Sequence, residues 1–199
     1  VAETRNFLIV SVLDDVVSAC RFWRYADGAF SLERTFQGEI GVVPGVSGVD
    51  AQESDAIWVT SDGYTKPPTL ALADASDPDA QEELKALPAM FDAAGVKTEQ
   101  HFATSADGTK VPYFLVMRAD APRDGSTPTI LYGYGGFEVS LTPGYSGGVG
   151  AAWLEKGYAY VQANIRGGGE YGPSWHQAAL KEKRHKAYED FEAVPLRPA

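Results

Sequence analysis

The sequence predicts an all-β segment followed by an α/β domain. Residues 5–75 contain short runs of β-forming residues with turn signals between them. Residues 129–172 instead follow the order strand, glycine-rich turn, helix, strand and second glycine-rich turn. Small residues at 92–95 separate these regions, and we place a domain boundary there, between residues 1–93 and 94–199.

The first region is expected to form antiparallel strands. Turn signals occur at Asp14-Asp15, Asp27-Gly28 and Asp62-Gly63. The expected strands cover residues 7–12, 16–25, 56–60 and 69–73. Strands of this length suit a β-sandwich or the blades of a β-propeller. Cys20, the single cysteine, lies inside one of them, where it is interpreted as a small buried hydrophobe.

A helix is expected to begin at Asp77, before the domain boundary. Asp77 suits the N-cap, and Pro78 suits the first helical position. Glu82 and Glu83 stand early in this stretch, where the helix dipole favours negative charge. Pro88 would end or kink the helix.

The second region is expected to open with a hairpin. Strands at 98–104 and 112–119 are separated by Asp107-Gly108, which is a strong hairpin signal. The last expected helix covers residues 186–194. It should end there, because Pro195 and Pro198 cannot continue it.

A βαβ unit is expected between the hairpin and the last helix. Its strands cover 129–132 and 158–165, and its helix covers 147–156 with Gly157 as the stop. Both strands end in glycine-rich turns, and 12 of the 21 glycines lie in this part of the chain. Ligands gather beyond the carboxyl ends of parallel strands. The chemistry is therefore expected near Tyr134 or Gly167.

The composition narrows the classes of function. The chain has 17 basic and 27 acidic residues in 199, a net charge of −10, which argues against nucleic acid as a partner. No apolar run is long enough to predict a membrane span. A single cysteine excludes an intrachain disulfide and a thiolate metal cluster. His101, His176 and His185 share no metal-ligand spacing, so neither a metal nor another cofactor is expected.

Two sequence motifs resemble those of the prolyl oligopeptidase family of serine peptidases. They are Leu131-Tyr132-Gly133-Tyr134-Gly135-Gly136-Phe137, and Ala163-Asn164-Ile165-Arg166-Gly167-Gly168-Gly169-Glu170-Tyr171-Gly172 followed by Trp175-His176. The resemblance extends more loosely over nearly the whole chain. It implies that residues 1–93 are the last strands of a β-propeller plus a linker helix. Residues 94–199 would be the N-terminal half of an α/β-hydrolase domain, incomplete and truncated before the nucleophile.

The resemblance implies roles for two aromatic residues. The Tyr134 hydroxyl would stabilise the oxyanion that develops in acyl transfer, and Phe137 would line the apolar pocket for the substrate's proline ring. The alternatives are an aromatic packed in a turn for Tyr134 and core packing for Phe137.

Ser146 lies in a formal G-x-S-x-G nucleophile pattern, at Gly144-Tyr145-Ser146-Gly147-Gly148. A nucleophile elbow needs a buried strand directly before the serine, whereas Ser146 follows the turn-like residues 141–144. His176 and His185 follow it but belong to other patterns. We therefore do not expect Ser146 to be the nucleophile.

A second alternative is a nicotinamide-dependent enzyme. Gly167, Gly169 and Gly172 satisfy G-x-G-x-x-G after a strand, and Asp190 stands 18 residues beyond the last glycine. A dinucleotide site would need Asp190 at the end of another strand, but residues 187–194 have a helical pattern.

The expected function is part of a serine endopeptidase that cleaves short peptides after proline. The resemblance implies a Ser-His-Asp triad, none of whose members has a matching position here, so the chain alone is expected to be inactive. Its partners would be short proline-containing peptides, with no nucleic acid or membrane, and the complete enzyme would be a monomer. A non-catalytic propeller-type binding module is a further alternative. The compartment is expected to be cytoplasmic, with the periplasm as the alternative.

Overall fold

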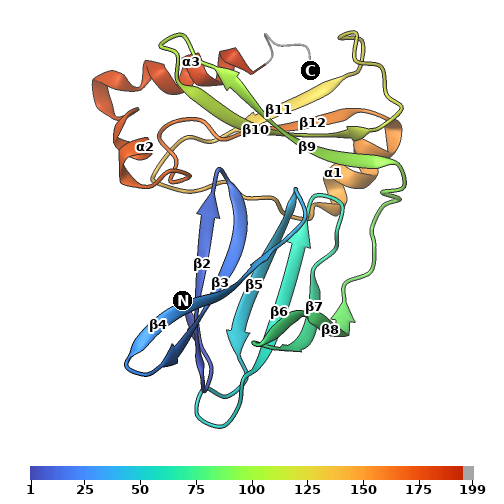
Figure 1. The fold of residues 1–199 in the computed structure, drawn as a ribbon. Coiled ribbons are helices and arrows are strands. Elements are labelled where there is room, and N and C mark those ends of the chain that lie inside the picture. The colour runs from blue at the N-terminus through green and yellow to red at the C-terminus, as the bar shows by residue number, and fades with distance from the viewer. Residues whose placement is uncertain (195–199) are drawn as a thin grey trace. The chain divides into compact units, whose positions relative to one another are not determined.

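A computed structural model of the chain describes residues 1–194 (Figure 1). The chain divides into two compact units. The first consists of Val1–Ala89 with Pro143–Tyr145, and the second comprises Met90–Thr142 and resumes at Ser146.

The first unit is built from antiparallel strands throughout. Its residues 1–89 are all described and form two four-stranded sheets. One sheet contains, in order, β1 (Ala2–Glu3), β2 (Phe7–Asp14), β3 (Val17–Ala26) and β4 (Ala29–Gln37). The other contains β5 (Val42–Gly48), β6 (Ala56–Gly63), β7 (Thr69–Asp74) and β8 (Asp77–Ala86). The four strands expected from sequence are confirmed as β2, β3, β6 and β7.

The core of the first unit lies between its two sheets. Because side chains alternate along a strand, Phe7 and Ile9 of β2 both point inward. They pack in one buried cluster with Phe22 of β3 and with Ile57 of β6. Cys20 is fully buried in the same cluster, as expected, and burial raises the pKa of its thiol.

The helix expected at Asp77 is wrong, because residues 77–86 form strand β8. The strand pairs with β7, and Leu70 lies opposite Lys85 in the register. Residues 79–86 are exposed, as suits a charged strand at the edge of a sheet, and Pro78 stands near the start of that strand. Main-chain pairing with β7 therefore outweighed the local capping pattern. The turn expected at Asp62-Gly63 comes slightly later, since β6 continues through Gly63 and mutual hydrogen bonds between Gly63 and Lys66 close the turn.

The second unit contains a mixed four-stranded sheet, counted over its described residues, with the order β11-β12-β10-β9. The expected hairpin is confirmed as β9 (Val96–Thr104) and β10 (Lys110–Arg118), which are antiparallel. β11 (Thr129–Gly133) and β12 (Ala159–Ala163) are parallel, so the βαβ unit is also confirmed. β12 lies between β11 and β10 (Figure 1).

Short helices connect and follow these strands. Between β11 and β12 lie α1 (Gly147–Ala152) and the 3-10 turn η1 (Leu154–Lys156), which ends at Gly157 with φ of 82°. After β12 come α2 (Pro173–Gln177), η2 (Lys181–Lys183) and α3 (His185–Ala193). α3 confirms the last expected helix, whereas the prolines expected to end it lie outside the described residues. No helix within residues 1–194 is long and apolar enough to span a membrane.

Candidate active site

The two glycine-rich turns of the second unit lie against each other. β11 and β12 are parallel and pair as far as Gly133 and Ala163, so the turns that follow them leave the same edge of the sheet. A Cβ atom on Gly167 would overlap the carbonyl oxygen of Gly135, and one on Gly169 would overlap that of Glu138. Glycine is therefore required where the two backbones touch.

The first turn has an unusual backbone. Gly135, Phe137 and Glu138 have φ values of 55°, 54° and 57°, in the left-handed region. That region is uncommon for residues with a side chain, and each such residue costs on the order of 1–3 kcal/mol. Surrounding contacts must therefore hold this conformation.

Side chains from beyond the second turn supply part of that support. The Nη1 atom of Arg184 donates a hydrogen bond to the carbonyl oxygen of Gly135. The amide of Glu138 lies 3.3 Å from the carbonyl oxygen of Gly167 and 3.1 Å from Nδ1 of His176. That same Nδ1 atom lies 2.7 Å from the Gly167 oxygen, so the His176 ring contacts the backbone of both turns.

Two buried polar side chains hold the continuation of the first turn. Glu170 Oε1 accepts a hydrogen bond of 3.0 Å from the amide of Leu141. Asn164 Nδ2 donates one of 2.8 Å to the carbonyl of Leu141 and another of 3.2 Å to Glu170. Both side chains are buried, and burial raises the pKa of Glu170. Together they satisfy both backbone groups of Leu141.

A buried ion-pair network lies behind the second turn. The Arg166 side chain is only 4% exposed and bonds to Asp190, which is fully buried, at 2.7 Å. On its other side Arg166 bonds to Asp107 at 2.6 Å, and Lys186 lies 3.2 Å from the same carboxylate. The hydrogen bond from Arg166 lowers the pKa of Asp107, while Asp190 raises that of Arg166. The network ties the end of β12 to α3 and to the β9–β10 turn.

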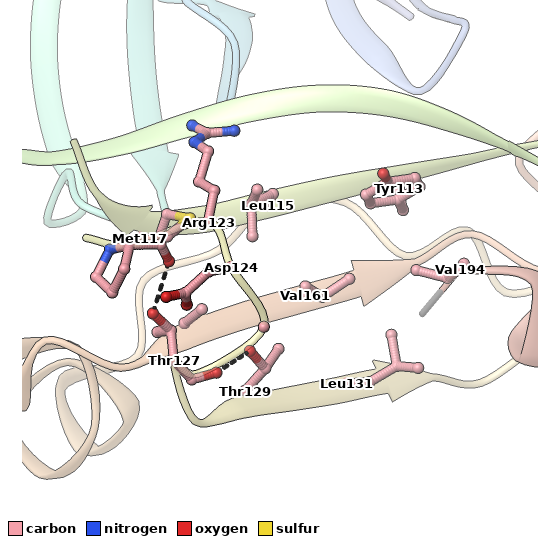
Figure 2. A pocket seen from close by; sticks show the side chains of 13 residues that line it. Tyr113, Leu115, Met117, Arg123, Asp124, Thr127, Thr129, Leu131, Val161 and Val194 are labelled. Carbon is pink, nitrogen blue, oxygen red and sulfur yellow. Dashed lines mark hydrogen bonds between the residues drawn. The ribbon is translucent and has the colours of Figure 1, made fainter. Parts of the chain in front are cut away.

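A cavity of about 580 Å³ lies elsewhere on the second unit (Figure 2). Leu115, Val161 and Leu131 form its apolar floor on β10, β12 and β11. Thr129 and Ala159, the first residues of the two parallel strands, also line it. No residue of either glycine-rich turn lines the cavity, so it is separate from the site at the turns.

Comparisons with known proteins identify the family. The model of the prolyl oligopeptidase family matches residues 146–195. The uncharacterized peptidase y4nA of Sinorhizobium fredii is 47% identical over 192 residues, which are 96% of this chain and 26% of that protein. The chain belongs to the prolyl oligopeptidase family.

Other members of the prolyl oligopeptidase family show the same likeness. The prolyl endopeptidase of Elizabethkingia miricola is 40% identical over 138 residues, or 69% of this chain and 19% of that protein. The structure of a post-proline cleaving enzyme from Rickettsia typhi superposes with a TM-score of 0.78 at 32% identity, covering 97% of this chain and 28% of the other. The chain thus spans about a quarter or less of the length of these relatives.

The two aromatic residues expected in a prolyl oligopeptidase site lie together on the first turn. Tyr134 is 40% exposed and Phe137 is 85% exposed. Their rings stack at an interplanar angle of 25°, with centroids 6.4 Å apart. Core packing therefore does not explain Phe137. The catalytic and substrate-binding roles of the two residues remain predictions.

Ser146 has a structural role in the family segment that contains it. It is the N-cap of α1, and its hydroxyl oxygen accepts a 3.3 Å hydrogen bond from the amide of Val149. No strand leads into it, since residues 134–146 are all described and none is in a strand. The nucleophile elbow is therefore absent at Ser146.

The structure contradicts the nicotinamide alternative. Gly167 and Gly169 face the backbone of the first turn rather than open space. Asp190 lies on α3 and pairs with Arg166, not at the end of a strand where it would reach a ribose. Two of the three glycines in the pattern, Gly167 and Gly169, therefore serve packing between the two turns, whereas a Cβ on Gly172 would meet nothing within 4 Å.

The histidines form no metal site among residues 1–194, where no group of three candidate ligands occurs. His101 lies 2.9 Å from Glu99 and stacks on Tyr113. His185 Nδ1 lies 3.1 Å from the carbonyl oxygen of Glu182. His176 supports the first turn.

Sequence reasoning missed the residues that hold the turns in place. These are Asn164, Arg166, Glu170, Arg184 and Asp190. One signal was available, because Arg166 and Glu170 flank a glycine run directly after a buried strand. Charged residues in such a position are expected to be paired.

Proposed function

We propose that the chain supplies the oxyanion-stabilising turn of a serine peptidase that cleaves short peptides after proline. The observation that carries this proposal is the half-exposed Tyr134 on a turn whose backbone Arg184 contacts, at the carboxyl ends of two parallel strands. Post-proline cleavage is named for several relatives and is part of the proposal here.

The domain assignment is part of the same proposal. Residues 1–93 would form the last strands of a β-propeller, and two adjacent four-stranded antiparallel sheets support this. Residues 94–199 would be the first half of an α/β-hydrolase domain, whose loop after the third strand supplies part of the oxyanion hole. In the order of the second unit, that loop is the one that carries Tyr134.

The proposed chemistry uses the two aromatic residues of the turn. Negative charge develops on the carbonyl oxygen of the scissile bond, and the Tyr134 hydroxyl would donate a hydrogen bond to it. A donor fixed in advance is effective because it needs no reorganisation as the charge develops. The exposed Phe137 ring would contact the proline ring of the substrate, an apolar surface that suits an aromatic wall. The serine, histidine and aspartate of the triad would come from outside these 199 residues.

The first test uses the 199-residue chain itself. We expect no release of chromophore from a Gly-Pro amide or ester, because removing the nucleophile removes most of the catalysis that a triad provides. Hydrolysis that is lost on Ser146→Ala would contradict both this proposal and the capping role of Ser146. Peptide binding that survives Tyr134→Phe, without hydrolysis, would instead support a binding module.

The second test uses the whole peptidase that contains this segment. Tyr134→Phe removes only the phenol oxygen, and loss of one oxyanion donor lowers kcat by about 100- to 1,000-fold. Tyr132→Phe is the matched control, since Tyr132 lies in β11 outside the turn. Equal kcat values for the two variants would refute the role of Tyr134.

A further inference from the structure

The peptide group between Gly135 and Gly136, in the first turn, joins two residues that lack a Cβ atom. Little in the chain itself therefore prevents this peptide plane from rotating. The carbonyl oxygen of Gly135 accepts a hydrogen bond from Arg184, which lies 49 residues later in the chain. Rotation of that plane would redirect Tyr134 on one side and Phe137 on the other.

Arg184 is well placed to hold this oxygen. It immediately precedes α3 and is half-buried, so its cationic donor is partly shielded from water. Its guanidinium carbon lies 5.4 Å from the centre of the Tyr188 ring, one turn along α3. A Cβ on Gly167 would come within 3.0 Å of Nη1, so the second glycine turn closes around the same atom. The side chain is thus confined from two sides.

We propose that Arg184 is a positioning residue for acyl transfer. By fixing the carbonyl of Gly135, it holds the Tyr134 hydroxyl in the direction from which it stabilises the oxyanion. Arg184 does not touch the substrate and acts through Tyr134. This inference rests on the proposed function.

The local effect can be measured in the 199-residue chain. Hydrogen exchange is followed in peptides that cover residues 134–141, for the chain and for Arg184→Ala. We expect faster exchange in the variant at these residues and unchanged exchange in β10. Lys183→Ala is the matched control, because Lys183 is an exposed basic neighbour. Unchanged exchange at residues 134–141 would overturn the inference.

The functional effect is measured by a double-mutant cycle in the whole peptidase. Misplacing a catalytic group by about 1 Å can cost up to about 100-fold, so Arg184→Ala is expected to lower kcat by about 10- to 100-fold with little change in KM. In a Tyr134→Phe background the same substitution should change kcat by less than about 2-fold, because the group it positions is gone. An equal loss in both backgrounds would overturn the inference.

Two further measurements distinguish a positioning role of Arg184 from a general loss of folded structure. Added guanidinium at millimolar concentration should restore part of the kcat of Arg184→Ala and none of that of Tyr134→Phe. Arg184→Lys keeps the charge but loses the planar donor, so an intermediate kcat with an unchanged melting temperature is expected. If Arg184→Ala fails to fold, the cycle is run with Arg184→Lys, and equal losses in both backgrounds again overturn the inference. A Tyr134→Phe variant with full kcat would refute the proposed function instead.

Discussion

At the residue scale, the buried Arg166 needs both of its acidic partners. A charge removed from water is tolerated only where opposite charges and hydrogen bonds replace the solvent. Asp190 supplies this from α3, and Asp107 supplies it from the β9–β10 turn. The Asp107 side chain is about one third exposed, so its share of the stability is the smaller one.

The Asp107 pair predicts a pH dependence of stability. Because Arg166 lowers the pKa of Asp107 in the folded state, the pair contributes above the unfolded pKa of about 3.9 and is lost as the pH falls below it. Asp107→Asn should therefore lower the free energy of unfolding by about 1 kcal/mol at neutral pH, discounted for exposure. The free energy of unfolding of this variant should also decline less steeply between about pH 4 and 2.

Urea unfolding at a series of pH values measures this effect. Asp27→Asn is the control, because Asp27 is exposed in a turn at φ of 52°, a conformation that asparagine tolerates. Both variants remove one negative charge. Parallel stability curves for Asp107→Asn and the unaltered chain would contradict the role of the pair.

The resemblance to the prolyl oligopeptidase family pointed to Tyr134 and Phe137, whose roles stay predictions, but not to the residues that hold their turn in place. Arg166 bonds to Asp107 and Asp190, which are 59 and 24 residues away in the sequence. Local pattern carries no information on such pairs, since only the fold brings them together.

At the element scale, two glycines of α1 allow the effect of side-chain packing to be compared with that of intrinsic helix propensity. Gly148 and Gly150 both lie within this short helix. A Cβ on Gly148 would meet nothing within 4 Å, whereas one on Gly150 would overlap the ring of Phe91. The same substitution should therefore have opposite signs at two positions of one helix.

Thermal or urea unfolding of Gly148→Ala and Gly150→Ala checks this. Alanine at 148 should raise the free energy of unfolding by about 0.5–1 kcal/mol through helix propensity. Alanine at 150 should lower it by about 1–3 kcal/mol through overpacking, which exceeds the same propensity gain. Stabilisation by both substitutions would mean that Phe91 does not pack on α1 as described.

Elements with strong periodicity were predictable, and β8 was not. The βαβ unit combines two apolar runs with glycine stops, so local preference and final structure agree there. Residues 77–86 carry helix-capping and helix-forming residues, yet they pair with β7. An edge strand needs little apolar surface, so apolar and polar residues alternate only weakly along it. Its structure is then decided by the strand with which it pairs.

At the scale of the whole molecule, each unit has a core of its own. One buried cluster joins the two sheets of the first unit, and another joins the mixed sheet of the second unit with α3. Since the chain spans only about a quarter of the length of peptidase y4nA, the active enzyme is proposed to be a longer polypeptide.

The mass of the native protein tests that proposal. An antibody against this segment, applied to extracts of its source cells, should detect a protein well above 21.4 kDa. Intact mass after immunoprecipitation gives the value. A product near 21.4 kDa would mean that the cells make the segment by itself, and a binding role would then be favoured over peptidase chemistry.

The unpaired edge of strand β11 affects how the isolated chain should behave in solution. It stands at the end of its sheet, and within residues 1–194 only β12 pairs with it, so its outer row of amide and carbonyl groups is open. Ile130 and Tyr132 are both exposed along it. Such an edge is a template on which another chain can add a strand. Purified alone, the segment is expected to self-associate as its concentration rises, and a lysine at Ile130 should suppress this in light-scattering measurements.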